Sequence, residues 1–154
     1  EKTGGNIVIN GGTNNIVSNC ILKLYSGSAY GSSGVNGPAI LATSGSNNLI
    51  TNNIITLSSG AAGMKIVSSN NSIIGNRIQL LTSSEMSTGI FLLGTQCMVT
   101  NNVIDVSYLN TMSTNPSVGA LDPNDFNNTD NMTRKPIISF GSATSNYIQN
   151  NIAL

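Results

Sequence analysis

The chain has 154 residues, the length of a single domain, and it carries six basic and six acidic side chains. Its formal net charge is zero, and it contains neither His nor Trp. A neutral chain has no electrostatic attraction for nucleic acid or for an anionic membrane surface, so we expect neither as a partner. No apolar run approaches the roughly 18 residues of a membrane-spanning helix.

An eight-residue repeat recurs five times along the chain. Its fourth residue is Val or Ile, its sixth is Asn, and its eighth is Ile or Val. The repeats are residues 14–21, 47–54, 71–78, 96–103 and 145–152. Successive repeats lie 33, 24, 25 and 49 residues apart, so a period of 24 or 25 residues is lengthened once and about doubled once. A fixed period of this length, with short β-like runs, predicts a stack of β coils.

A short apolar strand precedes each repeat, at a distance of 11 or 12 residues from the repeated Asn. The first aligned residues of these strands are Ile7, Ile40, Met64, Ile90 and Ile138. A second strand lies inside each repeat, and a third strand follows it. This pattern predicts an all-β fold, a right-handed single-stranded parallel β-helix of the pectin-lyase-like type. We expect five to six coils and two long loop insertions in one domain, residues 1–154.

Stacked coils place the same repeat position of neighbouring coils on top of each other, and Ile and Val suit inward positions. We expect a first inward column of Val17, Ile50, Ile74, Val99 and Ile148. We expect a second inward column of Ile21, Ile54, Ile78, Val103 and Ile152. The repeated Asn residues should form a ladder in the turn, because Asn tolerates left-handed backbone and can bond to an Asn in the next coil. These are Asn19, Asn52, Asn76, Asn101 and Asn150.

Cys20 and Cys97 occupy different repeat positions, so we expect two free thiols. The regular coils carry few charges, and no two acidic residues recur at one repeat position. Enzymes that cleave polysaccharides by general acid and base need a pair of carboxylates. A polysaccharide-degrading enzyme is therefore not expected.

Two insertions interrupt the period, and function is often carried by such segments. The first, residues 25–38, holds Tyr25 and Tyr30 among Gly and Ser; it is either a plain surface loop or a loop that stacks on a sugar, a purine or a neighbouring subunit. The second, residues 108–136, holds five of the charges within residues 122–135. Its carboxylates lack the glycine and terminal Glu of a calcium loop, so no metal is expected.

The two ends of the chain show no polar cap of the kind that solenoids use to cover their open edges. We therefore expect the chain to be the C-terminal piece of a longer one. The coil repeats and the Asn-rich, charge-poor composition resemble the parallel β-helices of bacteriophage tail spikes and neck appendages. The start at Glu1-Lys2-Thr3 resembles the C-terminal fragment of the neck appendage of short-tailed Bacillus phages.

That resemblance implies an intramolecular chaperone of a viral protein, which acts in the host cytoplasm during assembly or in the virion. It implies a homotrimer, cut from the upstream spike chain by self-cleavage before Glu1 and released with ATP. Glu1 is then the candidate catalytic residue, because a carboxylate beside the scissile bond can act as general acid or base.

ATP is the cofactor that the resemblance implies, although no Walker-type loop is present. Tyr25 or Tyr30 could stack on the adenine, and Arg134 or Lys135 could bind the phosphates. Two alternatives stay open from the sequence: a carbohydrate-binding or carbohydrate-cleaving β-helix segment, and a purely structural segment of a fibre.

Overall fold

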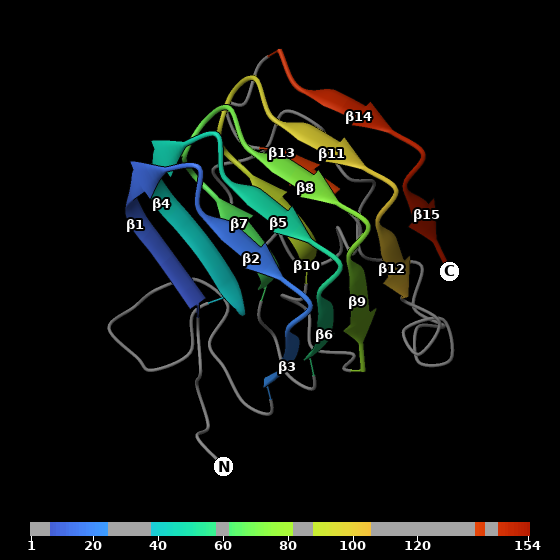
Figure 1. Ribbon diagram of the computed structural model, residues 1–154. Helices are drawn as coiled ribbons and strands as arrows, with labels where there is room; N and C mark the ends of the chain where they lie inside the picture. Colours follow the sequence, from blue (N-terminus) through green and yellow to red (C-terminus); the bar gives the residue numbers. More distant parts are fainter. Residues whose placement is uncertain (1–6, 25–37, 58–61, 82–87, 106–137, 141–144) are drawn as a thin grey trace, which may run out of the picture.

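The computed structural model describes residues 7–24, 38–57, 62–81, 88–105, 138–140 and 145–154. In these ranges the chain is all-β: it forms fifteen strands and no helix. The strands make three five-stranded sheets, here called A, B and C, in which every pairing is parallel. Figure 1 shows the strands of each sheet side by side in sequence order.

Each sheet takes one strand from every pass of the chain. Sheet A contains β1 (Ile7–Thr13), β4 (Ile40–Ser46), β7 (Ala62–Ile66), β10 (Thr88–Leu92) and β13 (Ile138–Phe140). Sheet B contains β2 (Ile16–Ser18), β5 (Leu49–Thr51), β8 (Ser72–Ile74), β11 (Met98–Thr100) and β14 (Tyr147–Gln149). Sheet C contains β3 (Ile21–Leu24), β6 (Ile54–Leu57), β9 (Arg77–Leu80), β12 (Val103–Asp105) and β15 (Ile152–Ala153).

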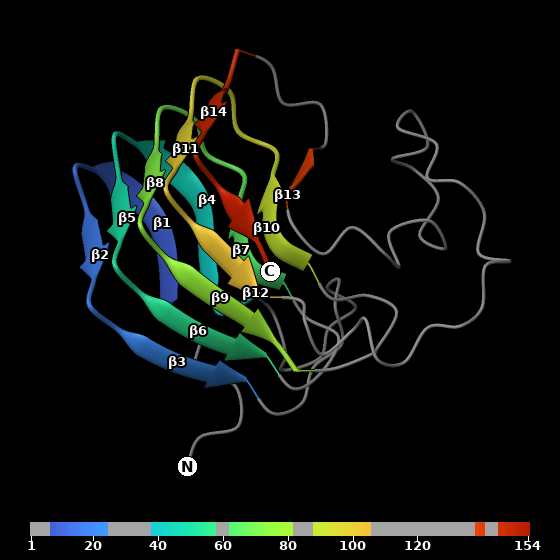
Figure 2. The same cartoon turned by 90° about the vertical axis from the view of Figure 1, so that its right-hand side faces the viewer.

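A strand therefore pairs with the strand three places further along the chain, for example β1 with β4 and β2 with β5. One pass through sheets A, B and C is called a coil below. In Figure 2 the coils follow one another from the blue first coil to the red last coil. The prediction of an all-β stack with three strands in each coil is confirmed.

The hydrophobic core lies between the three sheets. Aliphatic side chains from each sheet form columns that run from coil to coil, and in the middle coils they are fully buried. Sheet B contributes Ile50, Ile73 and Val99, and sheet C contributes Ile55, Ile78 and Ile104. Burying an aliphatic side chain of this size contributes about 1.5–3 kcal/mol, so these columns dominate the stability of the stack.

The predicted register of sheet A is confirmed. Ile7 pairs with Ile40, Ile40 with Met64, Met64 with Ile90, and Ile90 with Ile138. Each of these alignments follows from the apolar strands that precede the repeats.

The predicted first inward column is wrong at one position. Val17, Ile50, Val99 and Ile148 do share a column, but its third member is Ile73 and not Ile74. Ile74 pairs with Thr51 on the outward side of sheet B and is half-buried. The cause is a spacing that is one residue shorter in the third coil: Ile40 and Ile50 are ten residues apart, whereas their partners Met64 and Ile73 are nine apart.

The predicted second inward column is wrong in orientation. Ile21, Ile54, Val103 and Ile152 face outward, and Ile21 is 69% exposed. Arg77 pairs with both Ile54 and Val103 in that column, while Ile78 lies in the inward column between Ile55 and Ile104. A shift of one residue along a strand moves every side chain to the other face of the sheet.

Among the described residues, two corners recur from coil to coil, one between sheets A and B and one between sheets B and C, and each has a residue with left-handed backbone. The first corner uses Asn14, Asn47, Asn70, Gln96 and Ser145, all with φ between 56° and 60°. The second corner uses Asn19, Asn52, Gly75, Asn101 and Asn150. Four of the five Asn residues predicted for the ladder therefore supply the turn itself, and their side chains are exposed.

The residue after each left-handed position forms the ladder. The first ladder contains Asn15, Asn48, Asn71, Cys97 and Asn146, and the second contains Cys20, Asn53, Asn76, Asn102 and Asn151. In the second ladder, the Asn76 side-chain Nδ2 and backbone N–H both donate to Asn102 Oδ1, at 2.9 Å each. Its Nδ2 also donates to the Ile50 carbonyl of the coil before, at 2.9 Å. Each rung thus satisfies backbone groups that the corner leaves without a strand partner.

Gln96 is a poor residue for the position that it occupies. Its φ is 56°, and the three preceding coils have Asn at the same corner. Because Asn adopts left-handed backbone more readily than Gln, we expect Gln96→Asn to raise the free energy of unfolding by about 0.5 kcal/mol. Denaturant titration measures the change. Gln79→Asn, the same substitution in β9, is the control and should destabilise slightly, because Asn is disfavoured in strands.

Candidate interaction surface

The outward face of sheet B carries no charge at the positions that the structure describes. Two rows of side chains run along it, with one residue from each coil in each row. The first row, called the B row below, is Ile16, Leu49, Ser72, Met98 and Tyr147. The second row is Ser18, Thr51, Ile74, Thr100 and Gln149.

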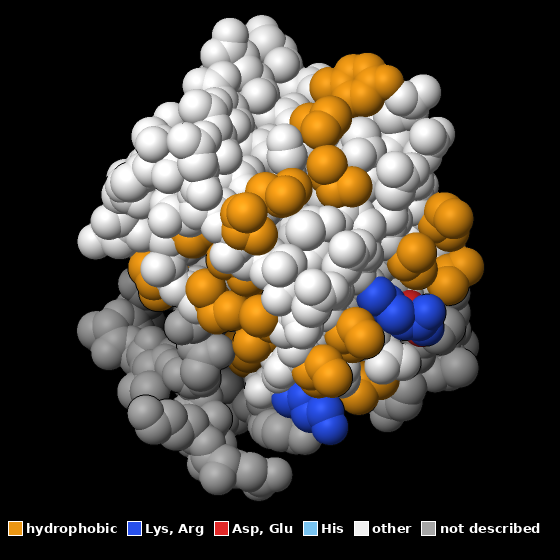
Figure 3. All heavy atoms as spheres, in the orientation of Figure 1, with side chains coloured by type: hydrophobic (Ala, Val, Ile, Leu, Met, Phe, Trp, Pro, Cys, Tyr) orange, Lys and Arg blue, Asp and Glu red, His pale blue; other side chains and the backbone are white. Residues whose placement is uncertain are grey.

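The ends of the B row are the most exposed: Ile16 is 67% exposed and Tyr147 is 55% exposed. Figure 3 shows apolar side chains following this face of the molecule across the strands of sheet B. Leu49, Ser72 and Met98, which lie between the two ends of the row, are half-buried. A scattered exposed aliphatic residue is ordinary, but a row that is apolar in four of its five positions is a candidate contact surface.

The outward face of sheet C combines an apolar row with charge. Its C row is Ile21, Ile54, Arg77, Val103 and Ile152. A parallel row of polar residues contains Lys23, Thr56, Gln79 and Asp105. The Arg77 Nη2 atom lies 3.4 Å from Asp105 Oδ2, and Arg77 is about half exposed, so this ion pair contributes less than about 1 kcal/mol to stability.

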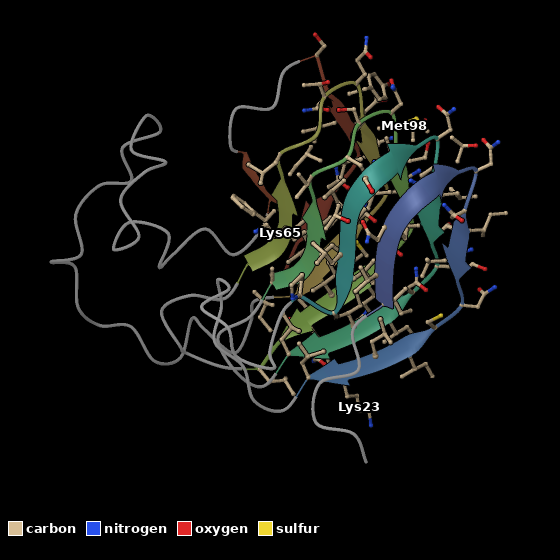
Figure 4. All side chains as sticks on the ribbon, turned by 90° about the vertical axis from the view of Figure 1, so that its left-hand side faces the viewer. Lys23, Lys65 and Met98 are labelled. Carbon is tan, nitrogen blue, oxygen red and sulfur yellow. The ribbon has the colours of Figure 1, made fainter. Side chains whose placement is uncertain are left out.

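Four ionic side chains are present in the described ranges: Lys23, Lys65, Arg77 and Asp105. Figure 4 shows that Lys23, Lys65 and Met98 lie on different sides of the stack, which matches their places in sheets C, A and B. The Lys65 ammonium lies 5.9 Å from the ring centroid of Phe91, a cation–π contact on the outward side of sheet A. The charges of the stack are thus spread over sheets A and C.

The described part of the chain contains neither a cluster of metal-ligating side chains nor a long apolar helix. No group of three or more His, Cys, Asp and Glu side chains comes together there. The described residues also contain no helix that could span a membrane.

Both cysteines are free, as predicted, and each takes the place of an Asn in one ladder. Burial raises the pKa of the Cys97 thiol, and hydrogen bonding to Asn71 opposes this shift. The thiol donates to the Ser68 carbonyl, with 3.7 Å between Sγ and O. Cys97 is therefore a neutral thiol that fills a ladder position, and its surroundings do not favour the thiolate that a nucleophile requires.

The candidate residues from the sequence lie outside the described ranges. These are Glu1 for self-cleavage, Tyr25 and Tyr30 for adenine, and Arg134 and Lys135 for phosphate. Self-cleavage and ATP binding therefore stay predictions. Sequence reasoning missed the C row because it assigned the eighth repeat position to the core.

Comparisons with family models, with curated proteins and with solved structures found no match for this chain.

Proposed function

We propose that the chain is a right-handed single-stranded parallel β-helix that acts as a homotrimeric assembly domain. In this proposal it is the trimerising, chaperone part of a phage tail spike or neck appendage. The β-helix is supported by the three parallel sheets, in which each strand pairs with the strand three places along the chain. The assembly role is supported by one observation above all, the aliphatic rows on the outward faces of sheets B and C.

The chemistry of these rows favours a protein partner over a sugar. Sugar rings stack on flat aromatic side chains, and Tyr147 is the aromatic residue among the described outward positions of sheets B and C. Most of the other members are Ile, Leu, Met and Val, whose burial against similar side chains contributes about 25 cal/mol for each Å² removed from water. The neutral chain adds no long-range repulsion between identical copies.

The mass in solution tests this proposal. Static light scattering at micromolar concentration should give three times the chain mass of 15.9 kDa. The measured mass should not fall when salt is added, because the contact is apolar rather than ionic. A mass equal to that of a single chain would overturn the assembly role.

A carbohydrate-binding function is the second candidate, and the polar row of sheet C favours it. Lys23, Thr56, Gln79 and Asp105 place one hydrogen-bonding side chain in each of four successive coils. A glycan array separates the two functions. Glycan binding that Gln79→Ala abolishes would support this candidate, and an array without a bound glycan would remove it.

A further inference from the structure

We propose that Asn10 is a site of spontaneous deamidation in the folded chain, where the backbone nitrogen of Gly11 attacks the side-chain amide, while the two ladders protect the asparagines at the corners. Asn10 lies in β1 and is exposed, and Gly11 follows it directly. Among the described residues it is the one Asn that precedes a glycine. Glycine has no side chain that hinders the approach of its nitrogen to the neighbouring amide.

The reaction needs no partner other than water. The Gly11 nitrogen gives its proton to water or hydroxide and bonds to Asn10 Cγ, which closes a succinimide ring. The bond from Cγ to Nδ2 then breaks, and Nδ2 takes up a proton and leaves as ammonia. Water opens the succinimide at either carbonyl and produces aspartate or isoaspartate at position 10. Both reacting groups belong to adjacent residues, so the attack is intramolecular.

The Asn10 amide has its oxygen hydrogen-bonded and its nitrogen open. The Ser44 hydroxyl donates to Asn10 Oδ1 at 3.2 Å, and the Thr43 Oγ1 atom lies 3.1 Å from the same oxygen and 3.2 Å from the Ile9 carbonyl oxygen. No described residue accepts a hydrogen bond from Asn10 Nδ2. Hydroxyl donors on Oδ1 stabilise the negative charge that this oxygen gains when Cγ is attacked. Nδ2 is left to take its proton from water and depart.

The backbone beside Asn10 is irregular, and this favours ring closure. Asn10 pairs with Ser44, and the register between β1 and β4 shifts on both sides of this pair. Gly11 and Gly12 lie in the shifted stretch, with φ of 108° and 72°. An irregular stretch has fewer regular ladder bonds, so a rotation of the backbone at Asn10 breaks fewer bonds than it would in a regular strand.

The corner asparagines are exposed too, but the ladders hold the nitrogen that would attack them. Asn19, for example, is followed by Cys20, whose backbone N–H donates to Asn53 Oδ1 at 3.0 Å. That nitrogen can lose its proton only if the ladder bond is broken. The exposed corner residues whose following N–H is held by a ladder Asn in this way are Asn14, Asn19, Asn47, Asn52 and Asn101.

Either product changes the first coil. Aspartate adds a negative charge to a chain whose net charge is zero. Isoaspartate inserts an additional methylene group into the backbone of β1, so that the residues after position 10 no longer match their partners in β4. We therefore expect the isoaspartate form to lose the pairing of Thr13 with Ser46.

Mass spectrometry of the folded chain, incubated for several weeks at mildly alkaline pH, tests the proposal. Trypsin cuts after Lys2 and Lys23, so one peptide, residues 3–23, contains Asn10 together with Asn14 and Asn19. We expect the gain of one mass unit at Asn10 to be at least about tenfold faster than at Asn14 or Asn19, because each of these requires a ladder bond to break. In denaturant, Asn14 and Asn19 should convert faster than in the folded chain. Comparable rates at Asn10 and at a corner Asn of the folded chain, or an unmodified peptide, would overturn the proposal.

Two matched variants test the surroundings of Asn10. Ser44→Ala removes a hydroxyl donor from Oδ1 and should slow the conversion at Asn10 about threefold. Ser18→Ala, the same change on sheet B, should leave that rate unchanged. Circular dichroism establishes that both variants are folded. An equal or faster conversion in Ser44→Ala would reject the part that we assign to the hydroxyl.

Discussion

Ile73→Asp is expected to prevent folding or to lower the free energy of unfolding by several kcal/mol. The Ile73 side chain is fully buried, and its column neighbours are Ile50 and Val99. A carboxylate at this position would lose its water and meet only aliphatic side chains, so it would be buried unpaired or become protonated. Substitutions that bury an unpaired charge are among the most destabilising known.

Ile74→Asp is the matched control, because the residue type, the strand and the substitution are the same. Ile74 lies on the outward face of sheet B between Thr51 and Thr100, where a carboxylate keeps contact with water. We expect a loss of about 1 kcal/mol, the cost of placing Asp in a strand. Denaturant titration of the two variants at the same protein concentration measures both losses. Equal losses, or a greater loss for Ile74→Asp, would show that the register of β8 is wrong.

Asn102→Ala is expected to cost about 3–5 kcal/mol, since it removes a fully buried rung of the second ladder. The Asn102 Oδ1 atom accepts from the backbone N–H and from Nδ2 of Asn76, both at 2.9 Å. Its Nδ2 atom donates to the Ile73 carbonyl and to Asn151 Oδ1, also at 2.9 Å. Alanine would leave buried donors and acceptors without partners, and each such group costs about 1–3 kcal/mol.

The adjacent residue provides the control for this prediction. Asn101 is exposed and has a φ of 57°, so Asn101→Ala loses only the preference of Asn for left-handed backbone, about 1 kcal/mol. The unfolding free energies of the two alanine variants are compared directly. If Asn101→Ala is the more damaging of the two, the ladder runs through the residue that the sequence favoured and not through Asn102.

The all-β class and the register of sheet A could be predicted from the sequence because their signals are clear. Each strand of sheet A contains a short apolar run, and the distances from these runs to the repeats hardly vary. The period of 24 or 25 residues is typical of a stack of β coils.

The inward faces of sheets B and C could not be predicted in the same way, because neighbouring residues in the repeats are often identical. Asn52-Asn53, Ile54-Ile55 and Ile73-Ile74 each offer two equal candidates for one position. A strand reveals its buried face by alternation, and a pair of identical residues removes that signal.

The sequence contains one signal for the correct register of β8, at Gly75. Gly75 has a φ of 66° and takes the left-handed position that Asn52 and Asn101 hold in the neighbouring coils. Glycine is the residue that most readily adopts this conformation. Aligning Gly75 with Asn52 would have placed Ile73 in the core and Asn53 in the ladder with Asn76, and would have put Arg77 in the same row as Ile54, on the outward face.

The hydrogen bonds of the second ladder join each inner coil to the coil before it and to the coil after it. Asn76, for example, bonds to Asn53 and Ile50 in the coil before and to Asn102 in the coil after. A coil in the middle of the stack therefore cannot open without breaking bonds on two sides, whereas a terminal coil breaks bonds on one side. The stack should behave as a one-dimensional cooperative chain that melts inward from its ends. For the same reason, whole coils that keep both ladder positions could be duplicated or deleted in related chains without loss of the fold, which would change the length of the stack in steps of about 4.8 Å.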